Sequence, residues 1–182
     1  MDSAGGDRAS SECVESLRRI KDAQDRDVLE RALSAARQEL GMDAAYITTI
    51  DSGYQTIEAV VGDLEALGAA EGIKLPVEES FCMKMLEGRI PNVVPDTRAE
   101  PALRDLDVTT HIGAYVGVPV TLSDGRVHGT LCCACESPRT ELGVQQLGFM
   151  RVLADMVAAR LDQVQGNVSR LTERFRTRRG AV

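Results

Sequence analysis

Three of the cysteines of this chain fall within four positions, a spacing that raises the question of a metal site or a redox switch. Cys132, Cys133 and Cys135 lie in "GTLCCACESPR", and Cys13 and Cys82 bring the total to five. Structural zinc sites use repeated spacings such as C-x₂-C, which are absent here, so the run does not indicate a metal site. An odd number of cysteines without a secretory signal is typical of reduced thiols, and we expect a cytoplasmic protein.

The cysteine run falls on the second strand of a predicted hairpin, residues 112–122 and 126–136 around "SDGR". Asp-Gly between β-rich runs is a strong hairpin signal, and a two-residue turn would pair Gly117 with Cys132. Strand alternation then sorts the side chains onto two faces. One face is apolar and should pack on helices: Ala114, Val116, Val118, Val120, Leu122, Val127, Leu131, Cys133 and Cys135. The other is mixed and carries a glycine, which predicts a cavity on this side: Tyr115, Gly117, Pro119, Thr121, His128, Thr130, Cys132 and Ala134.

This alternation separates the thiols by environment. Cys133 and Cys135 are predicted to behave as small buried hydrophobic residues. Cys132 should point to the opposite side, toward the predicted cavity. A bond between Cys132 and Cys133 would join side chains on opposite faces and would be strained.

The sequence also predicts helices and further strands that pack with this hairpin. Apolar residues at helical spacing predict a helix that ends at Gly41, after a polar joint near residues 21–27 and a disordered leader over residues 1–10. The β-rich runs 44–50 and 54–62 predict a second hairpin around "DSG". Ser80 is a suitable N-cap for a short helix in "SFCMKMLEG", and an extended piece and an irregular loop follow it.

The last predicted helix begins near Thr140 and continues toward the end of the chain. Alternating steps of four and three residues indicate a coiled-coil seam. Its positions are Val157, Leu161, Val164, Val168, Leu171 and Phe175. The end of this helix should extend beyond what one domain needs to cover its own sheet.

The bulk composition limits the partners. The 182 residues carry a net charge of −7, which argues against binding to nucleic acid or to an anionic membrane. The arginines near the C-terminus are interpreted as a solvated helix face. No apolar run is long enough to span a bilayer, so no membrane association is expected.

Four segments carry a family resemblance: "SFCMKMLEGRIPNVVPDTR", "IGAYVGVPV", "GTLCCACESPRTEL" and "LGFMRVLADMVAARL". In this order they resemble a GAF domain over roughly residues 22–162, most of all the GAF modules of bacterial cyclic-di-GMP enzymes and sensor kinases. The resemblance implies an α+β fold. Helices of both termini would cover one face of a central antiparallel sheet, and loops with a short helix would enclose a ligand cavity on the other. It also implies a homodimer joined in parallel through the terminal helices. Together with the heptad seam, the resemblance predicts a domain over residues 11–162 and a coiled-coil signalling linker over residues 163–182.

The predicted cavity defines the candidate ligand-binding residues, drawn from the first strand, the short helix, the "VPDTR" segment and the last hairpin. They are Tyr46, Thr48, Phe81, Cys82, Met85, Asp96, Arg98, His111, Tyr115, Gly117 and Cys132. A structural alternative exists for several of them. Phe81, Cys82 and Met85 also suit an ordinary core, and Asp96 with Arg98 also suits a loop braced by an Asx turn or a local ion pair.

Departures from known GAF sequence patterns argue against several classes of ligand. The cyclic-nucleotide signature of this family is absent, and Cys82 is followed by Met83 rather than the histidine usual in bilin-binding members. Some members bind haem through a histidine, for which His111 is placed best. We expect an unidentified small molecule and neither haem nor bilin.

The resemblance also offers a thiol enzyme as an alternative. Free methionine-R-sulfoxide reductases hold a cysteine at the position of Cys82 but need another in the following long loop, and residues 89–131 contain none. We therefore predict a non-enzymatic dimeric sensor that passes its ligand state through the terminal helices to an output domain in cis or to a signalling partner. The alternatives are a reductase-like enzyme using Cys82 and a degenerate dimerisation module with a collapsed cavity.

Overall fold

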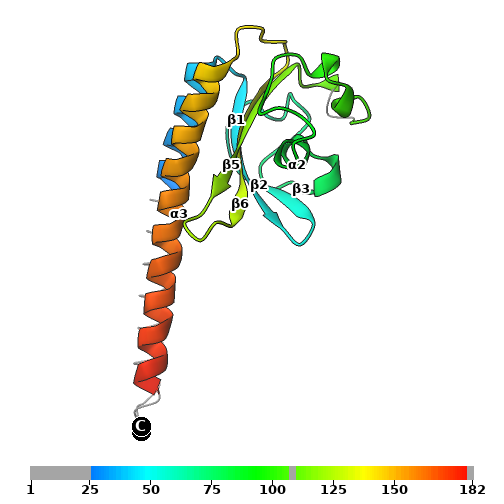
Figure 1. The fold of residues 1–182 in the computed structure, drawn as a ribbon. Helices are drawn as coiled ribbons and strands as arrows, with labels where there is room; N and C mark the ends of the chain where they lie inside the picture. The colour runs from blue at the N-terminus through cyan, green and yellow to red at the C-terminus, as the bar shows by residue number, and fades with distance from the viewer. Residues whose placement is uncertain (1–25, 107–109, 180–182) are drawn as a thin grey trace.

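The computed structural model describes residues 26–106 and 110–179, with only the backbone described for residues 165–179. The predicted leader lies outside these residues, and so does the predicted joint except for its last two residues, Arg26 and Asp27, which belong to the first described helix. The fold is α+β, as predicted, with helices and loops on the two faces of an antiparallel sheet (Figure 1).

Six strands form the sheet in the order β3-β2-β1-β6-β5-β4, and every neighbouring pair is antiparallel. Their bounds are β1 Ala44–Asp51, β2 Tyr54–Gly62, β3 Lys74–Pro76, β4 Val93–Val94, β5 Ala114–Thr121 and β6 Val127–Cys135. β6 is therefore a central strand, paired on both sides, and it holds Cys132 at the middle of the sheet.

Both predicted hairpins are present, with one difference in the second turn. Gly117 lies opposite Cys132 as predicted, but the turn contains three residues, and Gly125 has a φ of 83°. An extra residue on β6, His128, restores the predicted register from Val120 inward. Because this bulge reverses the alternation, Val127 is 43% exposed and does not pack on the helices, which corrects its predicted burial.

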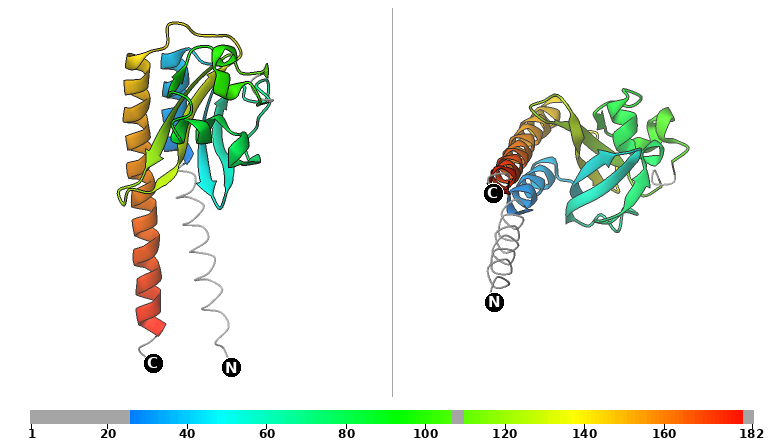
Figure 2. Two further views of the ribbon diagram at one scale, coloured as in Figure 1. Left: turned by 45° about the vertical axis from the view of Figure 1, so that its right-hand side comes forward. Right: turned by 90° about the horizontal axis from the view of Figure 1, so that it is seen from below.

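One face of the sheet is covered by the helix over residues 26–40 and by α3 (Val144–Arg179), which lie side by side (Figures 1 and 2). Gly41 ends the first helix with a φ of 61°, as predicted. Cys133 and Cys135 are buried in the core beneath these helices, which confirms that they behave as small hydrophobic residues. α3 begins four residues after the predicted Thr140.

The opposite face is covered by the middle of the chain. α2 (Phe81–Leu86) follows the one-turn helix η1 (Val77–Glu79), and the turns η2 (Thr97–Ala99) and η3 (Pro101–Leu103) follow later. The Ser80 side chain accepts a hydrogen bond from the Met83 amide, so the predicted N-cap of α2 is confirmed. A second apolar core lies between these segments and the sheet.

α3 extends well past the sheet (Figures 1 and 2). The start of the predicted seam belongs to the core of the chain itself, because Val157 is only 1% exposed and Leu161 packs against the same core. The side chains of the later seam positions, from Val168 onward, lie outside the described residues, so the coiled coil stays a prediction. Within the described part of the chain, no helix is both long and apolar enough to cross a membrane.

Candidate functional site

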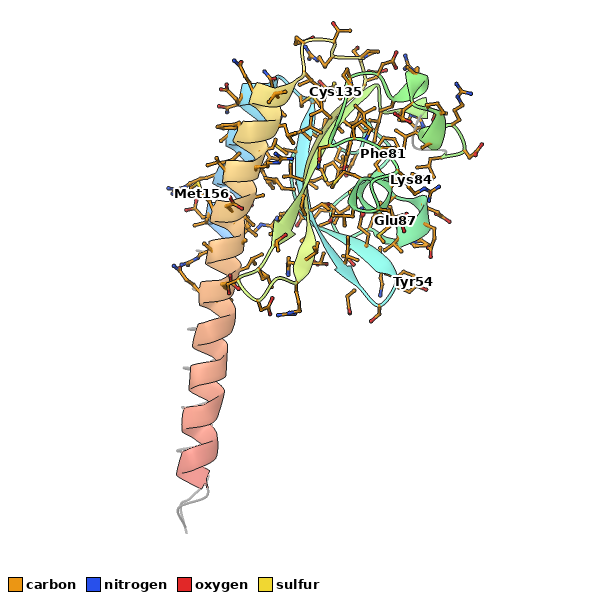
Figure 3. The ribbon with its side chains drawn as sticks, viewed as in Figure 1. Tyr54, Phe81, Lys84, Glu87, Cys135 and Met156 are labelled. Carbon is orange, nitrogen blue, oxygen red and sulfur yellow. The ribbon has the colours of Figure 1, made fainter. Side chains whose placement is uncertain are left out.

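The mixed face of the last hairpin is closed tightly by its own side chains. Tyr115 is fully buried and folds over Gly117, where an added Cβ would overlap the Tyr115 hydroxyl. Phe81 points from α2 toward the sheet (Figure 3) and meets the Tyr115 ring edge-on, with the ring centroids 5.4 Å apart. The space that the glycine predicted is therefore filled by Tyr115, and the cavity is smaller than expected.

What remains is a cavity of about 40 Å³ beneath the middle segments. Its residues come from β1, β2, residues 63–73, the α2 region and the start of β5: Tyr46, Gln55, Ile57, Leu64, Leu67, Ala69, Leu75, Glu79, Ser80, Phe81, Cys82 and Ile112. Glu79 is exposed and Leu75 is half-buried, so one end of the cavity lies at the surface. The volume suits about three water molecules or a ligand of a few heavy atoms.

Gln55 gives this cavity an unsatisfied polar group. The side chain is 3% exposed, and its Oε1 atom has no hydrogen-bond partner in the described structure. A buried amide oxygen normally accepts a hydrogen bond, and leaving it unpaired costs on the order of 1–3 kcal/mol. A water or ligand that donates a hydrogen bond from within the cavity would remove this cost.

Two thiols meet beside the cavity. The Sγ atoms of Cys82 on α2 and Cys132 on β6 are 3.5 Å apart, and the Tyr115 hydroxyl lies 3.3 Å from Cys132 Sγ and 3.6 Å from Cys82 Sγ. The network continues from Cys132 to the Thr130 hydroxyl at 3.2 Å and on to the Thr48 hydroxyl at 2.7 Å. All of these side chains are buried.

The network makes the two thiols unequal. Hydrogen bonding by the Cys132 thiol lowers the pKa of Cys82 to about 7, against the opposing effect of burial. Burial raises the pKa of Cys132 well above its ordinary value, and it does the same for Tyr115 and Tyr46. Cys82 is therefore the thiol that ionises first. Among the described residues, no group of three His, Cys, Asp or Glu side chains could hold a metal ion.

Seven of the predicted site residues come together around this network: Tyr46, Thr48, Phe81, Cys82, Tyr115, Gly117 and Cys132. Met85 is buried on the same helix but does not line the cavity. Its sulfur accepts a hydrogen bond from the Asn92 amide nitrogen at 3.1 Å, and it contributes to a separate surface depression near Pro119.

Three predicted residues lie apart from the cavity. Asp96 accepts a hydrogen bond from the Arg98 backbone amide at 3.0 Å and caps η2, which is the bracing role considered as its alternative. The Arg98 and His111 side chains are exposed, and neither lines the cavity. Their contact with a ligand stays a prediction.

Several cavity residues were not predicted. Leu64 and Leu67 are buried within residues 63–72, a loop of turns rich in small and acidic residues, and their burial was not predicted. Their spacing of three residues, which suits one helical turn, was the available signal. The burial of Gln55 could not be predicted from the sequence, because a glutamine beside a hairpin turn usually faces solvent.

The comparisons with known proteins fit this architecture. The family model described as the GAF domain matches residues 26–161. The chain belongs to the GAF domain family. Members of this family generally serve as sensory or regulatory modules.

Similar proteins differ in function. A cyclic di-GMP phosphodiesterase of Pseudomonas aeruginosa is 26% identical over 152 residues, which cover 81% of this chain but only 24% of that relative. The blue-light-absorbing form of the PixJ GAF domain of Thermosynechococcus elongatus is 14% identical, with a TM-score of 0.65, over 84% of this chain and 94% of its own. A type II free methionine-R-sulfoxide reductase of Thermoplasma acidophilum is also 14% identical, with a TM-score of 0.62, over 79% and 96%. At these identities the two structures establish the fold alone.

Proposed function

We propose that this GAF domain is a sensor that binds a small polar molecule in the cavity beneath α2. The observation that carries the proposal is the buried, unpartnered Oε1 of Gln55 in a mostly apolar cavity. Ligand sites are typically apolar enclosures with a few placed polar groups that orient the ligand. Gln55 supplies an acceptor and Cys82 a thiol, so the preferred ligand carries a hydrogen-bond donor.

The size of the cavity limits the ligand in the described arrangement. About 40 Å³ admits a few heavy atoms. A ligand as large as haem or a bilin would require α2 and the turn-rich residues 63–73 to move away from the sheet. We therefore propose a compact ligand, without naming its chemical identity.

The sheet offers a route from the ligand to the terminal helices. Cys132 faces the cavity side of β6, while the next residue, Cys133, faces α3, with its sulfur 3.8 Å from the Met150 sulfur. A ligand transmits a signal only if it binds two arrangements of the helices with different affinity. We propose that the ligand shifts α2 and the sheet, and that α3 passes this shift onward.

A homodimer is part of the same proposal. Val152 and Met156 are 58% and 59% exposed, lie one turn apart on α3, and face away from the sheet (Figure 3 shows Met156). Apolar side chains at this spacing suit pairing with a second helix. The proposed partner is α3 of a second copy, with the pairing continued by the part of α3 beyond the sheet.

The proposed output is a signalling enzyme or partner. The chain spans about a quarter of its phosphodiesterase relative. An output domain that acts on a cyclic dinucleotide is one form this output would take.

Ligand-observed NMR with a panel of small alcohols, amides and carboxylic acids tests the binding proposal. We expect at least one compound to show saturation transfer from the wild-type chain and to lose it with Gln55→Leu. Gln145→Leu, on the exposed surface of α3, is the matched control and should retain binding. Binding that survives Gln55→Leu, or a panel with no binder, would contradict the proposal and favour a dimerisation module.

A thiol enzyme is the second candidate, and one observation favours it. Residues 89–131 contain no cysteine, but Cys132, the next residue, supplies a thiol 3.5 Å from Cys82. We rank it below the sensor because the cavity is too small for methionine sulfoxide without movement of α2. Turnover of free methionine sulfoxide that is lost in Cys82→Ser would reverse this ranking.

A further inference from the structure

Ligand sensing uses the Cys82 thiol as a lining group of the cavity, but it does not explain why Cys132 lies against that thiol. The two sulfur atoms are in van der Waals contact at 3.5 Å, as reduced thiols. A disulfide needs a separation near 2.05 Å, so the sulfurs would have to approach by about 1.5 Å. The residues are 50 positions apart in the chain, so such a bond would join α2 directly to the central strand β6.

The approach can come from the α2 side. β6 is fixed by hydrogen-bonded strands on both sides, β1 and β5. α2 is a helix of six residues that follows η1 and rests on the sheet through side-chain packing. A small displacement of α2 therefore costs no sheet hydrogen bond.

A small oxidant can reach only one of these thiols through the cavity. Cys82 lines the cavity, whose outer end lies by exposed Glu79, whereas Cys132 lies behind Cys82 and is absent from the lining. Hydrogen peroxide has two heavy atoms and fits within about 40 Å³. Cys133 and Cys135 lie in the other core, beneath the helices.

The hydrogen bonds also distinguish attacking and resolving thiols. The Tyr115 hydroxyl donates toward Cys82 Sγ, and the Cys132 thiol lies within hydrogen-bond distance. Both contacts stabilise a thiolate on Cys82, which is the form that attacks a peroxide. Cys132, whose thiol keeps its proton, is placed to attack Cys82 afterwards.

We propose that Cys82 and Cys132 form a reversible intramolecular disulfide when the protein meets hydrogen peroxide. The Cys82 thiolate attacks one peroxide oxygen, an S–O bond forms as the O–O bond breaks, and the departing hydroxide takes up a proton to become water. Cys132 sulfur then attacks Cys82 sulfur, the S–O bond breaks, and hydroxide leaves as water with the Cys132 proton. In total the two thiols lose two electrons and two protons, and one peroxide becomes two waters.

Peptide mapping of the full chain tests the proposal. Cys13→Ser serves as the background, so that this thiol outside the described residues cannot form a disulfide. The native protein is treated with a slight excess of hydrogen peroxide, blocked with an alkylating agent, and digested without reductant. We expect one linked peptide pair, Cys82 with Cys132, that dithiothreitol returns to free thiols, while Cys133 and Cys135 remain alkylatable after unfolding.

A variant and its control separate the oxidation of Cys82 from the formation of the disulfide. Cys132→Ser should abolish the linked peptide and leave a sulfenic acid on Cys82 that dimedone captures. Cys133→Ala, equally buried but on the opposite face, is the matched control and should keep the disulfide. If Cys132→Ser does not fold, the map of the background protein still decides the question.

Two results would overturn the inference: both thiols staying reduced at peroxide levels that oxidise free cysteine, or a link between other cysteines. The inference is independent of the proposed sensor function. A compound that binds in the NMR panel would still support the sensor if no disulfide forms, and a disulfide would stand if no compound binds.

Discussion

At the scale of single residues, Gly117 and Tyr115 decide the character of the site. The strand pattern identified Gly117 as the small residue opposite Cys132, and this pairing is correct. The pattern could not show that the Tyr115 ring would fold into the space, because this depends on a side-chain rotamer and on Phe81 packing against it. The contact between Cys82 and Cys132 was equally hidden, since no periodicity relates residues 50 positions apart.

The first prediction concerns this packing. Gly117→Ala places a Cβ against the Tyr115 hydroxyl and should lower the free energy of unfolding by about 1–3 kcal/mol, as overpacking does. Tyr115→Phe in the same chain should recover part of the loss, because it removes the overlapping hydroxyl. Urea denaturation measures both.

Gly148→Ala is the control for this prediction. Gly148 lies in α3 with nothing within 4 Å of an added Cβ, so alanine there should stabilise by up to about 1 kcal/mol through helix propensity. Equal stability of the Gly117→Ala and wild-type chains would show that Tyr115 does not occupy the space as described.

A second prediction at this scale concerns pH. Because the pKa of Cys82 is lowered to about 7, its thiolate fraction rises through neutrality, below the range of an ordinary cysteine near 8.5. The rate of peroxide-driven disulfide formation should rise about fivefold from pH 6 to pH 7 and only about twofold more up to pH 9. Time courses in which alkylation stops the reaction give this rate at each pH. A midpoint at 8.5 or above would contradict the assigned role of Cys82 as the attacking thiol.

At the scale of elements, turn chemistry and alternation predicted most of the sheet. The Asp124-Gly125 pair located the last hairpin, and the register held from Val120 inward although the turn is one residue longer than predicted. The three-residue turn and the bulge at His128 compensate each other in the register. Neither could be predicted from the alternation of side chains along the two strands. The burial of Leu64 and Leu67 was not predicted, because these leucines stand among acidic and small residues that are typical of an exposed loop.

The third prediction tests α2 as the movable cover of the cavity. The Ser80 hydroxyl accepts from the Met83 amide at 3.1 Å, and its own proton goes to the Val77 carbonyl at 2.9 Å. Ser80→Ala should cost about 0.5–2 kcal/mol of stability and should speed alkylation of Cys82 in the native protein, because α2 opens more often. Ser80→Thr keeps the hydroxyl and should alkylate at nearly the wild-type rate. Unchanged alkylation in Ser80→Ala would mean that α2 does not control access.

At the scale of the whole molecule, the sheet separates two cores of different composition. The core beneath the helices is purely apolar apart from its thiols, whereas the core beneath α2 contains the tyrosines, the thiol pair and the cavity. Neighbouring residues of β6 contribute to opposite cores. A displacement of Cys132 therefore occurs one residue away from Cys133, which packs against α3. This arrangement gives the proposed sensor a short physical route from ligand to helix.

The fourth prediction concerns assembly. Met156→Arg should raise the dimer dissociation constant about tenfold or more, because it places a charge in the proposed α3 contact while leaving the chain's own core intact. Gln145→Arg is the matched control on the same helix. Light scattering over a concentration series measures the change. Identical association of Met156→Arg and wild type would place the dimer contact elsewhere.

The central claim is that a small molecule occupies the cavity beside Gln55, and native mass spectrometry of freshly purified protein tests it most directly. We expect added small-molecule mass on the wild-type chain, absent from Gln55→Leu and retained by Gln145→Leu. Protein that carries no added mass, before or after incubation with a cell extract of small metabolites, would contradict the claim and indicate a structural module.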